Sequence, residues 1–239
     1  MATVSLQHFT ADFPPFLCYN LPVAHKKGGF KIRTKSHKSL GIYLSEKYLQ
    51  SVPKHYVRVF LFGCTQPDRN PATYLKGSLR CQWLRGHNWK NAKRYIARLC
   101  RRLEKRQSLG LFDYYSLGKL VHYTVDAFTS AHNDYFPSGL QNHREYEHRL
   151  HAYFTSYLQR NRMQISVRFD SLMDVIRSHH RQYAKLPVSI QTDSYYCVLV
   201  TSIMVYMLHT SFPPVIDRDF FCLNSPSFCI NILAFSIFP

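Results

Sequence analysis

The residues of this chain with the clearest chemical potential are five histidine and carboxylate side chains within a 26-residue window. They include two pairs spaced four residues apart, His122 with Asp126 and His143 with Glu147, and His132 lies between the pairs. Residues four apart share one face of an α-helix, so each pair can point at one ion. Zinc accepts imidazole and carboxylate ligands at catalytic sites, where a water keeps one position open. The spacing therefore predicts a metal site that His132 reaches from a helix end.

The residues around the first pair bear on whether it holds a metal. A single His/Asp pair at this spacing is more often a helix salt bridge or a solvated pair. Here the flanking residues are apolar: Leu117, Leu120, Val121, Val125 and Phe128. They place His122 and Asp126 near the buried side of a helix, where an uncompensated carboxylate is costly. A cation would remove that cost, and two pairs with a bridging histidine favour the metal interpretation.

The order of these ligands resembles the core of the zinc-dependent phospholipase C / P1-type nuclease family. The resemblance rests on His122-x3-Asp126-x5-His132, followed by His143-x3-Glu147, and on Leu117-Gly118 just before the first histidine. Weaker matches lie upstream, in Ser36–Gly41 with His37, in Cys64–Asp68 with Asp68 and in Arg85–His87 with His87. Together the matches cover roughly residues 34–160.

The resemblance implies a cluster of two or three zinc ions that hydrolyses phosphodiesters. Asp126 lies between His122 and the remaining ligands and is expected to bridge two ions. Asp68 is expected to orient the attacking water as a base, so Asp68 and Asp126 are the predicted catalytic residues. The complete set of predicted metal ligands is His37, Asp68, His87, His122, Asp126, His132, His143 and Glu147.

By the same resemblance, one ion is completed by Asp68, His87 and His122, and another by His132, His143 and Glu147. The chain departs from the family in three respects, one of which is a shorter spacing from His132 to His143 than in the best-known secreted members. Secreted members use the amine of their mature N-terminus as a ligand, whereas at least 33 residues precede the first predicted helix here. Members often carry proline two residues before the histidine matched by His132, whereas this chain has Ser130.

Net charge restricts the class of partner. The chain carries a formal charge of +17, with 31 Lys and Arg against 14 Asp and Glu, and such a field attracts nucleic acid, anionic membranes or phosphorylated substrates. Its clearest amphipathic helix spans residues 89–106 and has one acid, Glu104. Basic residues are ordinary on a solvated helix face, but this excess also suits a polyanion-facing surface. The residues predicted for it are Lys90, Lys93, Arg94, Arg98, Arg101 and Arg102.

The elements that must position these residues are helical. Apolar spacing predicts a helix from Ser36 and helices over 89–106, 114–131, 141–160 and 169–184, together with a buried final helix over 195–208. Two segments depart from this pattern: Tyr56–Phe62 is strand-like and Pro67–Pro71 is expected to be a loop that carries Asp68. We expect an all-α fold, one domain over residues 34–212 around a zinc cluster.

The two ends are expected to lie outside that domain. Residues 1–33 contain three helix-breaking prolines, and the apolar run Phe13–Ala24 lacks a preceding basic region, so a signal peptide is not indicated. Residues 213–239 form an apolar tail of undetermined role. The run 195–208 is too short for a comfortable membrane span of about 20 residues. These features favour a cytoplasmic location or one peripheral to a membrane.

Seven cysteines, an odd number without regular spacing, do not indicate a disulfide framework, and the chain has no Cys-x2-Cys zinc motif. Three functional classes remain. The first hydrolyses the head-group phosphodiester of anionic or zwitterionic phospholipids and requires an apolar approach surface. The second cleaves single-stranded nucleic acid and requires an aromatic stacking platform, although Trp83 and Trp89 are expected to pack. The third is a non-catalytic, metal-stabilised binding protein. None requires an obligate protein partner.

Overall fold

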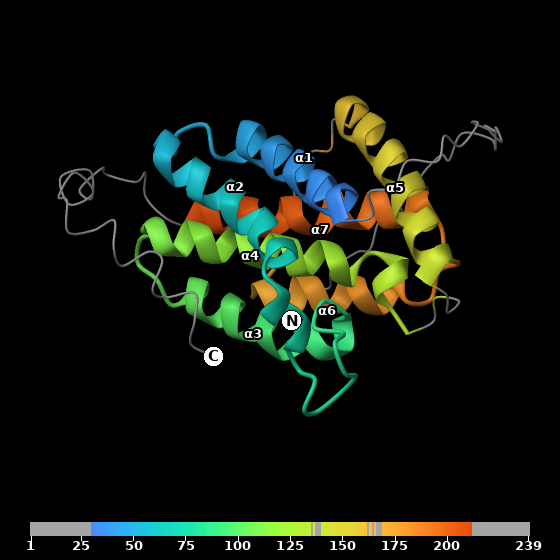
Figure 1. The fold of residues 1–239 in the computed structure, drawn as a ribbon. Coiled ribbons are helices and arrows are strands. Elements are labelled where there is room, and N and C mark those ends of the chain that lie inside the picture. The colour runs from blue at the N-terminus through green and yellow to red at the C-terminus, as the bar shows by residue number, and fades with distance from the viewer. Residues whose placement is uncertain are drawn as a thin grey trace, which may run out of the picture.

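The computed structural model describes residues 30–134, 136, 140–161, 163, 165 and 169–211, and all of its regular elements are helices (Figure 1). This confirms the predicted all-α fold. The elements are α1 (Phe30–Tyr48), α2 (Lys54–Arg69), the 3-10 helix η1 (Pro71–Leu75), α3 (Trp89–Glu104), α4 (Leu111–Ala127), the 3-10 helix η2 (Ser130–His132), α5 (Leu140–Arg160), α6 (Leu172–Tyr183) and α7 (Ile190–Ser211).

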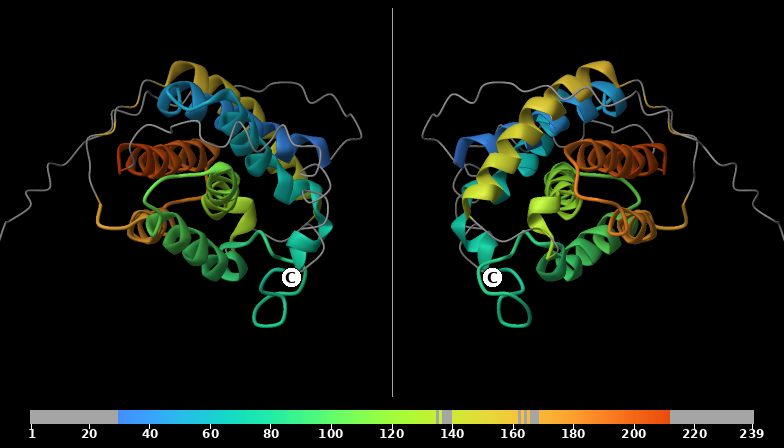
Figure 2. Two further views of the ribbon diagram at one scale, coloured as in Figure 1. Left: turned by 90° about the vertical axis from the view of Figure 1, so that its left-hand side faces the viewer. Right: turned by 90° about the vertical axis from the view of Figure 1, so that its right-hand side faces the viewer.

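The helices lie in three layers, with α4 and α7 in the middle (Figures 1 and 2). Helices α1, α2 and α5 cover one side of this middle layer, and α3 and α6 cover the other. From Ser116 to Ala127, every residue of α4 except Lys119 is buried. A helix that is buried all round must satisfy its polar side chains within the protein, so His122 and Asp126 need partners from the surrounding helices.

Two glycines allow α2 and α4 to approach closely. A Cβ on Gly118 would lie 2.2 Å from the carbonyl oxygen of Phe60, and a Cβ on Gly63 would lie 2.4 Å from that of Tyr115. Any larger side chain at these positions would therefore push the two backbones apart. The close approach brings the last turn of α2, which carries Asp68, next to the face of α4 that carries His122.

The structure corrects two predictions about this region. Tyr56–Phe62 is not a strand but lies within α2, because its aromatic and aliphatic side chains pack against α4 and tertiary packing overrides their β-propensity. Pro67–Pro71 is not simply a loop either. Pro67 lies inside the last turns of α2, and Pro71 begins η1. Asp68 is therefore held on a helix instead of on a loop.

Several predicted boundaries also shift. Helix α1 begins at Phe30, so Ser36 lies inside it, and the helix predicted for 89–106 ends at Glu104. The segment 114–131 divides into α4, which ends at Ala127, and η2, which ends at His132. The predicted tail, 213–239, lies outside the described residues, as do residues 1–29 of the N-terminal extension. Among the described helices, none is both long and apolar enough to cross a membrane.

Candidate metal centre

All eight predicted ligands converge where α1, α2, α4, η2, α5 and the segment before α3 meet. Seven of the eight are buried, and the eighth, His143, is partly buried. Their ligand atoms form three groups, each with all atoms within 4.8 Å of one another, and two of the groups share His122. The groups are His87, His122 and Asp126; His132, His143 and Glu147; and His37, Asp68 and His122.

The first group is built from two imidazoles whose outer nitrogens are fixed by hydrogen bonds. The Nδ1–H of His122 donates to the carbonyl oxygen of Cys64 at 2.9 Å, which leaves Nε2 as its lone-pair nitrogen. In His87, Nε2 lies 3.1 Å from Thr73 Oγ1. The single hydroxyl hydrogen of Thr73 is directed at the carbonyl oxygens of Pro67 and Asn70, so its oxygen accepts from His87. The lone-pair nitrogen of His87 is therefore Nδ1.

These lone pairs meet at Asp126. His87 Nδ1 lies 2.7 Å from Asp126 Oδ2, His122 Nε2 lies 3.2 Å from the same oxygen, and the two nitrogens are 3.2 Å apart. Two imidazole lone pairs and a carboxylate oxygen repel one another unless a positive charge lies between them. A proton on one nitrogen or a divalent cation would supply that charge, and the donor types match those of zinc.

The pKa shifts indicate the same preference for positive charge. Burial lowers the pKa of His122, but the carboxylates of Asp126 and Asp68 outweigh this effect and raise it overall. Burial likewise favours the neutral form of Asp126, yet His122 and His132 hold the pKa of its carboxyl well below the ordinary value. Burial lowers the pKa of His87 despite Asp126. A carboxylate that stays ionised beside a neutral imidazole is the state that binds a cation.

The second oxygen of Asp126 faces ligands from two other elements. Its Oδ1 lies 3.3 Å from His37 Nε2 on α1 and 3.7 Å from His132 Nε2 on η2. Asp126 thus contacts the first group through one oxygen and faces His37 and His132 through the other. This geometry suits the bridging role expected for it from the sequence.

The second group joins η2 to α5. Glu147 Oε1 lies 2.8 Å from His143 Nε2, one turn earlier on α5, and 3.4 Å from His132 Nε2. The pair at positions 143 and 147 therefore lies on one helix face, as its spacing predicts. The structure brings His132 to this pair as well as to Asp126.

The third group contains two buried atoms without a hydrogen-bond partner among the described residues, Asp68 Oδ2 and His37 Nδ1. The other carboxylate oxygen of Asp68 lies 3.7 Å from His122 Nε2, and the rings of His37 and His122 stack at 3.9 Å. A buried, unsatisfied carboxylate oxygen costs free energy unless a ligand occupies the site. The residues of all three groups therefore fit a metal cluster.

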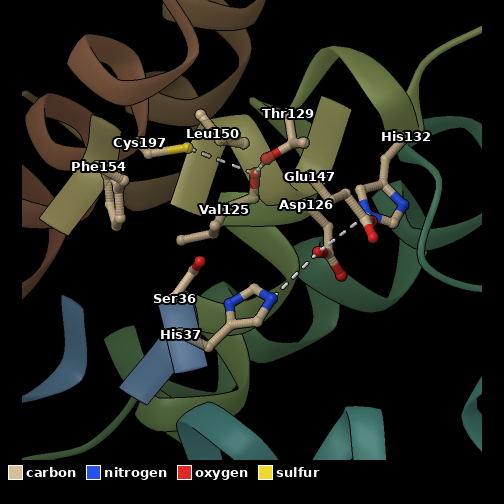
Figure 3. Close-up of a pocket in the computed structure, with 10 residues that line it drawn as sticks. All are labelled: Ser36, His37, Val125, Asp126, Thr129, His132, Glu147, Leu150, Phe154 and Cys197. Carbon is tan, nitrogen blue, oxygen red and sulfur yellow. Dashed lines mark hydrogen bonds and ion pairs between the residues drawn. The ribbon is translucent and has the colours of Figure 1, made fainter. Parts of the chain in front are cut away.

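A cavity of about 40 Å³ lies beside these groups (Figure 3). Its polar wall is formed by four of the predicted ligands, His37, Asp126, His132 and Glu147. The opposite side of the cavity is apolar and is formed by Val125, Leu150, Phe154 and Cys197. The volume exceeds what a water molecule requires, and the polar wall offers it several hydrogen-bond partners.

One functional residue was missed by the sequence prediction. Asp193, at the start of α7, is fully buried and accepts hydrogen bonds from the backbone N–H of Ser130, from the Ser130 hydroxyl, and from the hydroxyls of Tyr146 and Tyr183, at 2.7–2.8 Å. Ser130 begins η2, which carries His132, and Tyr146 precedes Glu147 on α5. Asp193 thus ties together both segments of the second ligand group. A sequence signal exists, because Asp193 is the one charged residue from Ile190 to Leu208.

The predicted polyanion surface lies on the outer face of α3. Lys90, Lys93, Arg94, Arg98, Arg101 and Arg102 are all exposed. Two of them form ion pairs, Lys90 with Asp134 at 3.6 Å and Arg102 with Asp113 at 3.4 Å. Arg98, Arg101, Arg102 and Lys105 line one shallow depression.

A helical bundle with a buried histidine and carboxylate cluster defines a class of metal-dependent proteins. A family model described as zinc-dependent phospholipase C matches residues 33–188, which is more than half of the chain. The chain belongs to that family of zinc-dependent hydrolases. The match extends from α1 through α6 and includes all eight predicted ligands. A search of curated proteins and a search of solved structures gave no match.

Proposed function

We propose that this protein hydrolyses the head-group phosphodiester of phospholipids at a zinc cluster held by the eight ligands. The proposal rests on one observation above the others: two imidazole nitrogens and an ionised carboxylate, all buried, converge on a point that favours positive charge, which a bound cation would supply. Membership in a zinc-dependent phospholipase C family supports zinc as that cation.

The roles of the chain's own residues follow from their positions. Zinc, when bound, lowers the pKa of a coordinated water to about 7 and neutralises charge on phosphoryl oxygens. Asp126 would hold two ligand groups at a fixed separation through its two oxygens. Asp68 Oδ2, which has no partner among the described residues, is available to accept a proton from the attacking water. The hydrogen bonds from His122 to Cys64 and from His87 to Thr73 would keep each lone pair directed inward.

The cavity favours a lipid over a nucleotide. At about 40 Å³ it has room for water and not for a hydrocarbon chain, but its apolar side, with Leu150 and Phe154, lies beside the ligand groups, and this apolar environment supports a lipid substrate. The alternative, a nuclease for single-stranded nucleic acid, is supported by the basic face of α3. The experiment described next distinguishes a phospholipid substrate from a nucleic-acid substrate.

The test combines metal content with turnover. Protein purified without chelator should contain at least two zinc equivalents and should hydrolyse choline phospholipid vesicles and bis-nitrophenyl phosphate, both in a zinc-dependent manner. Asp126→Asn removes the bridging charge and should lower zinc affinity and turnover together, by about 100-fold or more. Asp170→Asn, at an exposed carboxylate, is the matched control and should change neither.

Different outcomes would decide between the functional classes. Zinc-dependent cleavage of single-stranded DNA without hydrolysis of phospholipid vesicles would replace the phospholipase proposal with the proposal of a single-strand nuclease. Bound zinc without turnover of any of the three substrates would indicate a metal-stabilised scaffold. A folded protein that binds no metal would contradict the assignment of the centre itself.

A further inference from the structure

The segment from Leu75 to Arg85, between η1 and α3, projects from the body of the protein in all three views (Figures 1 and 2). Its apolar side chains face solvent: Leu79 is 96% exposed, Trp83 65% and Leu84 52%. This corrects the expectation that Trp83 packs, whereas Trp89 does pack, stacked on His180 at 4.3 Å. Single exposed apolar residues are ordinary, but a cluster on one projecting loop usually marks an interaction site.

The loop is built to hold this shape. The Asn91 side chain donates to the carbonyl oxygens of Lys76 and Gln82, at 3.1 and 2.7 Å, and accepts from Gln82 N at 3.2 Å. Gly77 has a φ of +71°, and a Cβ there would lie 2.8 Å from the carbonyl oxygen of Asn91. Leu84 N donates to Ser78 Oγ at 3.1 Å. The exposure of Leu79 and Trp83 therefore belongs to a braced loop, so little conformational entropy is lost when they bind a partner.

The charges around the loop select an anionic partner. Arg80 and Arg85 flank Trp83 and are exposed, and Lys90 follows at the start of α3, where it pairs with Asp134 at 3.6 Å. The sequence has no acidic residue between Asp68 and Glu104. Exposed apolar side chains with arginines beside them are the pattern of a segment that enters the head-group region of an anionic membrane, where tryptophan and leucine contact the acyl boundary and cations meet phosphates.

The loop is also connected to the metal centre. His87 follows Arg85 by two residues, and Gly86 N donates to the carbonyl oxygen of Tyr74 at 2.9 Å, which closes the base of the loop. The ligand at position 87 is therefore held by the same backbone that carries Leu79 and Trp83.

We propose that the loop from Leu75 to Arg85 docks the protein on anionic phospholipid bilayers by inserting Leu79 and Trp83 into the head-group region. The inference deepens the proposed function and rests on it for the lipid substrate, because it assigns the surface on which that substrate is presented. A nucleic acid would need several stacking rings along a groove, whereas this tip offers one tryptophan among leucines.

Tryptophan fluorescence can test this directly, since the chain has only Trp83 and Trp89. In a Trp89→Phe background, the emission of Trp83 should shift to the blue on addition of vesicles of phosphatidylserine and phosphatidylcholine phosphonate analogues, which resist hydrolysis. Brominated acyl chains should quench it. Pure phosphatidylcholine analogues should bind more weakly, and single-stranded DNA should leave the emission maximum unchanged.

Leu79→Asp supplies the decisive variant, because a side chain so exposed contributes little to the fold. It should weaken vesicle binding by about 10- to 100-fold, the loss expected for one apolar anchor, while turnover of bis-nitrophenyl phosphate stays unchanged. Phe112→Asp is the matched control. Phe112 is 57% exposed and follows the far end of α3, a 16-residue helix about 24 Å long, so this variant should bind vesicles within about twofold of the parent.

The outcomes separate the inference from the proposed function. Vesicle binding that survives Leu79→Asp, or a Trp83 emission that does not respond to vesicles, would overturn the docking loop even if lipids are hydrolysed. A shift with single-stranded DNA and none with vesicles would overturn it in favour of a nucleic-acid surface. Loop-dependent vesicle binding without any lipid hydrolysis would support the docking loop and contradict the proposed function.

Discussion

At the scale of single residues, the candidate centre depends on which nitrogen of each imidazole carries hydrogen. A main-chain carbonyl fixes His122 and a threonine hydroxyl fixes His87, so both rings present lone pairs to Asp126. Such outer contacts orient metal ligands and commonly change metal affinity by about 10- to 100-fold when removed. Asp193 contacts no ligand directly but orients two of them, because its hydrogen bonds to Ser130 and Tyr146 hold the segments that carry His132 and Glu147.

Asp193→Asn should therefore weaken one ligand group selectively. Each carboxylate oxygen of Asp193 accepts two hydrogen bonds, and an amide can accept at only one of its two atoms. We expect zinc at the His132, His143 and Glu147 group to be lost at about 10-fold lower chelator concentration, while zinc at the other groups stays. Chelator titration of bound zinc measures this. Asp174→Asn on α6 is the control, and equal loss from all groups in Asp193→Asn would refute a local role.

His180 predicts a pH dependence of stability. Burial lowers its pKa from 6.5 to about 4 in the folded protein, although a contact with the Ala127 backbone opposes this. The unfolded chain then binds the proton more readily, so stability falls as pH drops from 6.5 through about 4, by up to about 1.4 kcal/mol per pH unit. His180→Phe, which can still stack on Trp89, should flatten this slope. Urea unfolding of chelated protein over this pH range tests it, and an identical slope in both proteins would contradict the assignment.

At the scale of elements, the centre depends on how closely α2 and α4 pack. Gly63 and Gly118 face each other's helix, and neither has space for a methyl group. Their role could not be read from the sequence, because glycine within an apolar helical pattern indicates only that some close contact exists.

Gly118→Ala should consequently disturb both stability and metal binding. Its Cβ would meet the Phe60 carbonyl oxygen at 2.2 Å, which forces the helices apart, and overpacking of this kind typically costs about 1–3 kcal/mol. The same displacement would move Asp68 away from His122. Gly110→Ala is the control, because the nearest atom to a Cβ there is Asp113 Oδ2 at 3.9 Å. Urea unfolding and zinc content should separate the two variants, and a Gly118→Ala protein as stable as the parent would disprove the packing argument.

The sequence predicted the helical class, and spacing of four residues placed His122 with Asp126, and His143 with Glu147, on one helix face. The other upstream ligands, His37, Asp68 and His87, followed only from the resemblance to the family, and the structure brings them to the same place. Prediction from the sequence failed where long-range packing decides. Tyr56–Phe62 carries strand-like residues, yet its burial against α4 makes it helical. Asp193 was missed because its partners lie 47 and 63 residues earlier, at Tyr146 and Ser130. No local pattern encodes such contacts.

At the scale of the whole molecule, carboxylates and bases are divided between interior and surface. Among the acids in the part of the chain that the structure describes, five are buried: Asp68, Asp113, Asp126, Glu147 and Asp193. Three of the five, Asp68, Asp126 and Glu147, belong to the metal centre, and Asp193 holds two of the segments that carry its ligands. The surface of the described part is therefore depleted of acids, and the exposed bases of α3 add to the positive field around the docking loop.

This division predicts that the α3 surface acts through long-range attraction and the centre through chemistry. Replacing Lys93, Arg94 and Arg101 with glutamine should weaken binding to anionic vesicles and to single-stranded DNA at low salt and have little effect at high salt, because mobile ions screen exposed charges. For single-stranded DNA, the negative slope of log K against log salt should become shallower by about 2, the change expected for three lost phosphate contacts. Turnover of bis-nitrophenyl phosphate should stay unchanged, since these side chains lie on the outer face of α3. Binding measured over a salt series, with turnover alongside, tests both parts, and a parallel fall in turnover would instead place the α3 bases in the catalytic centre.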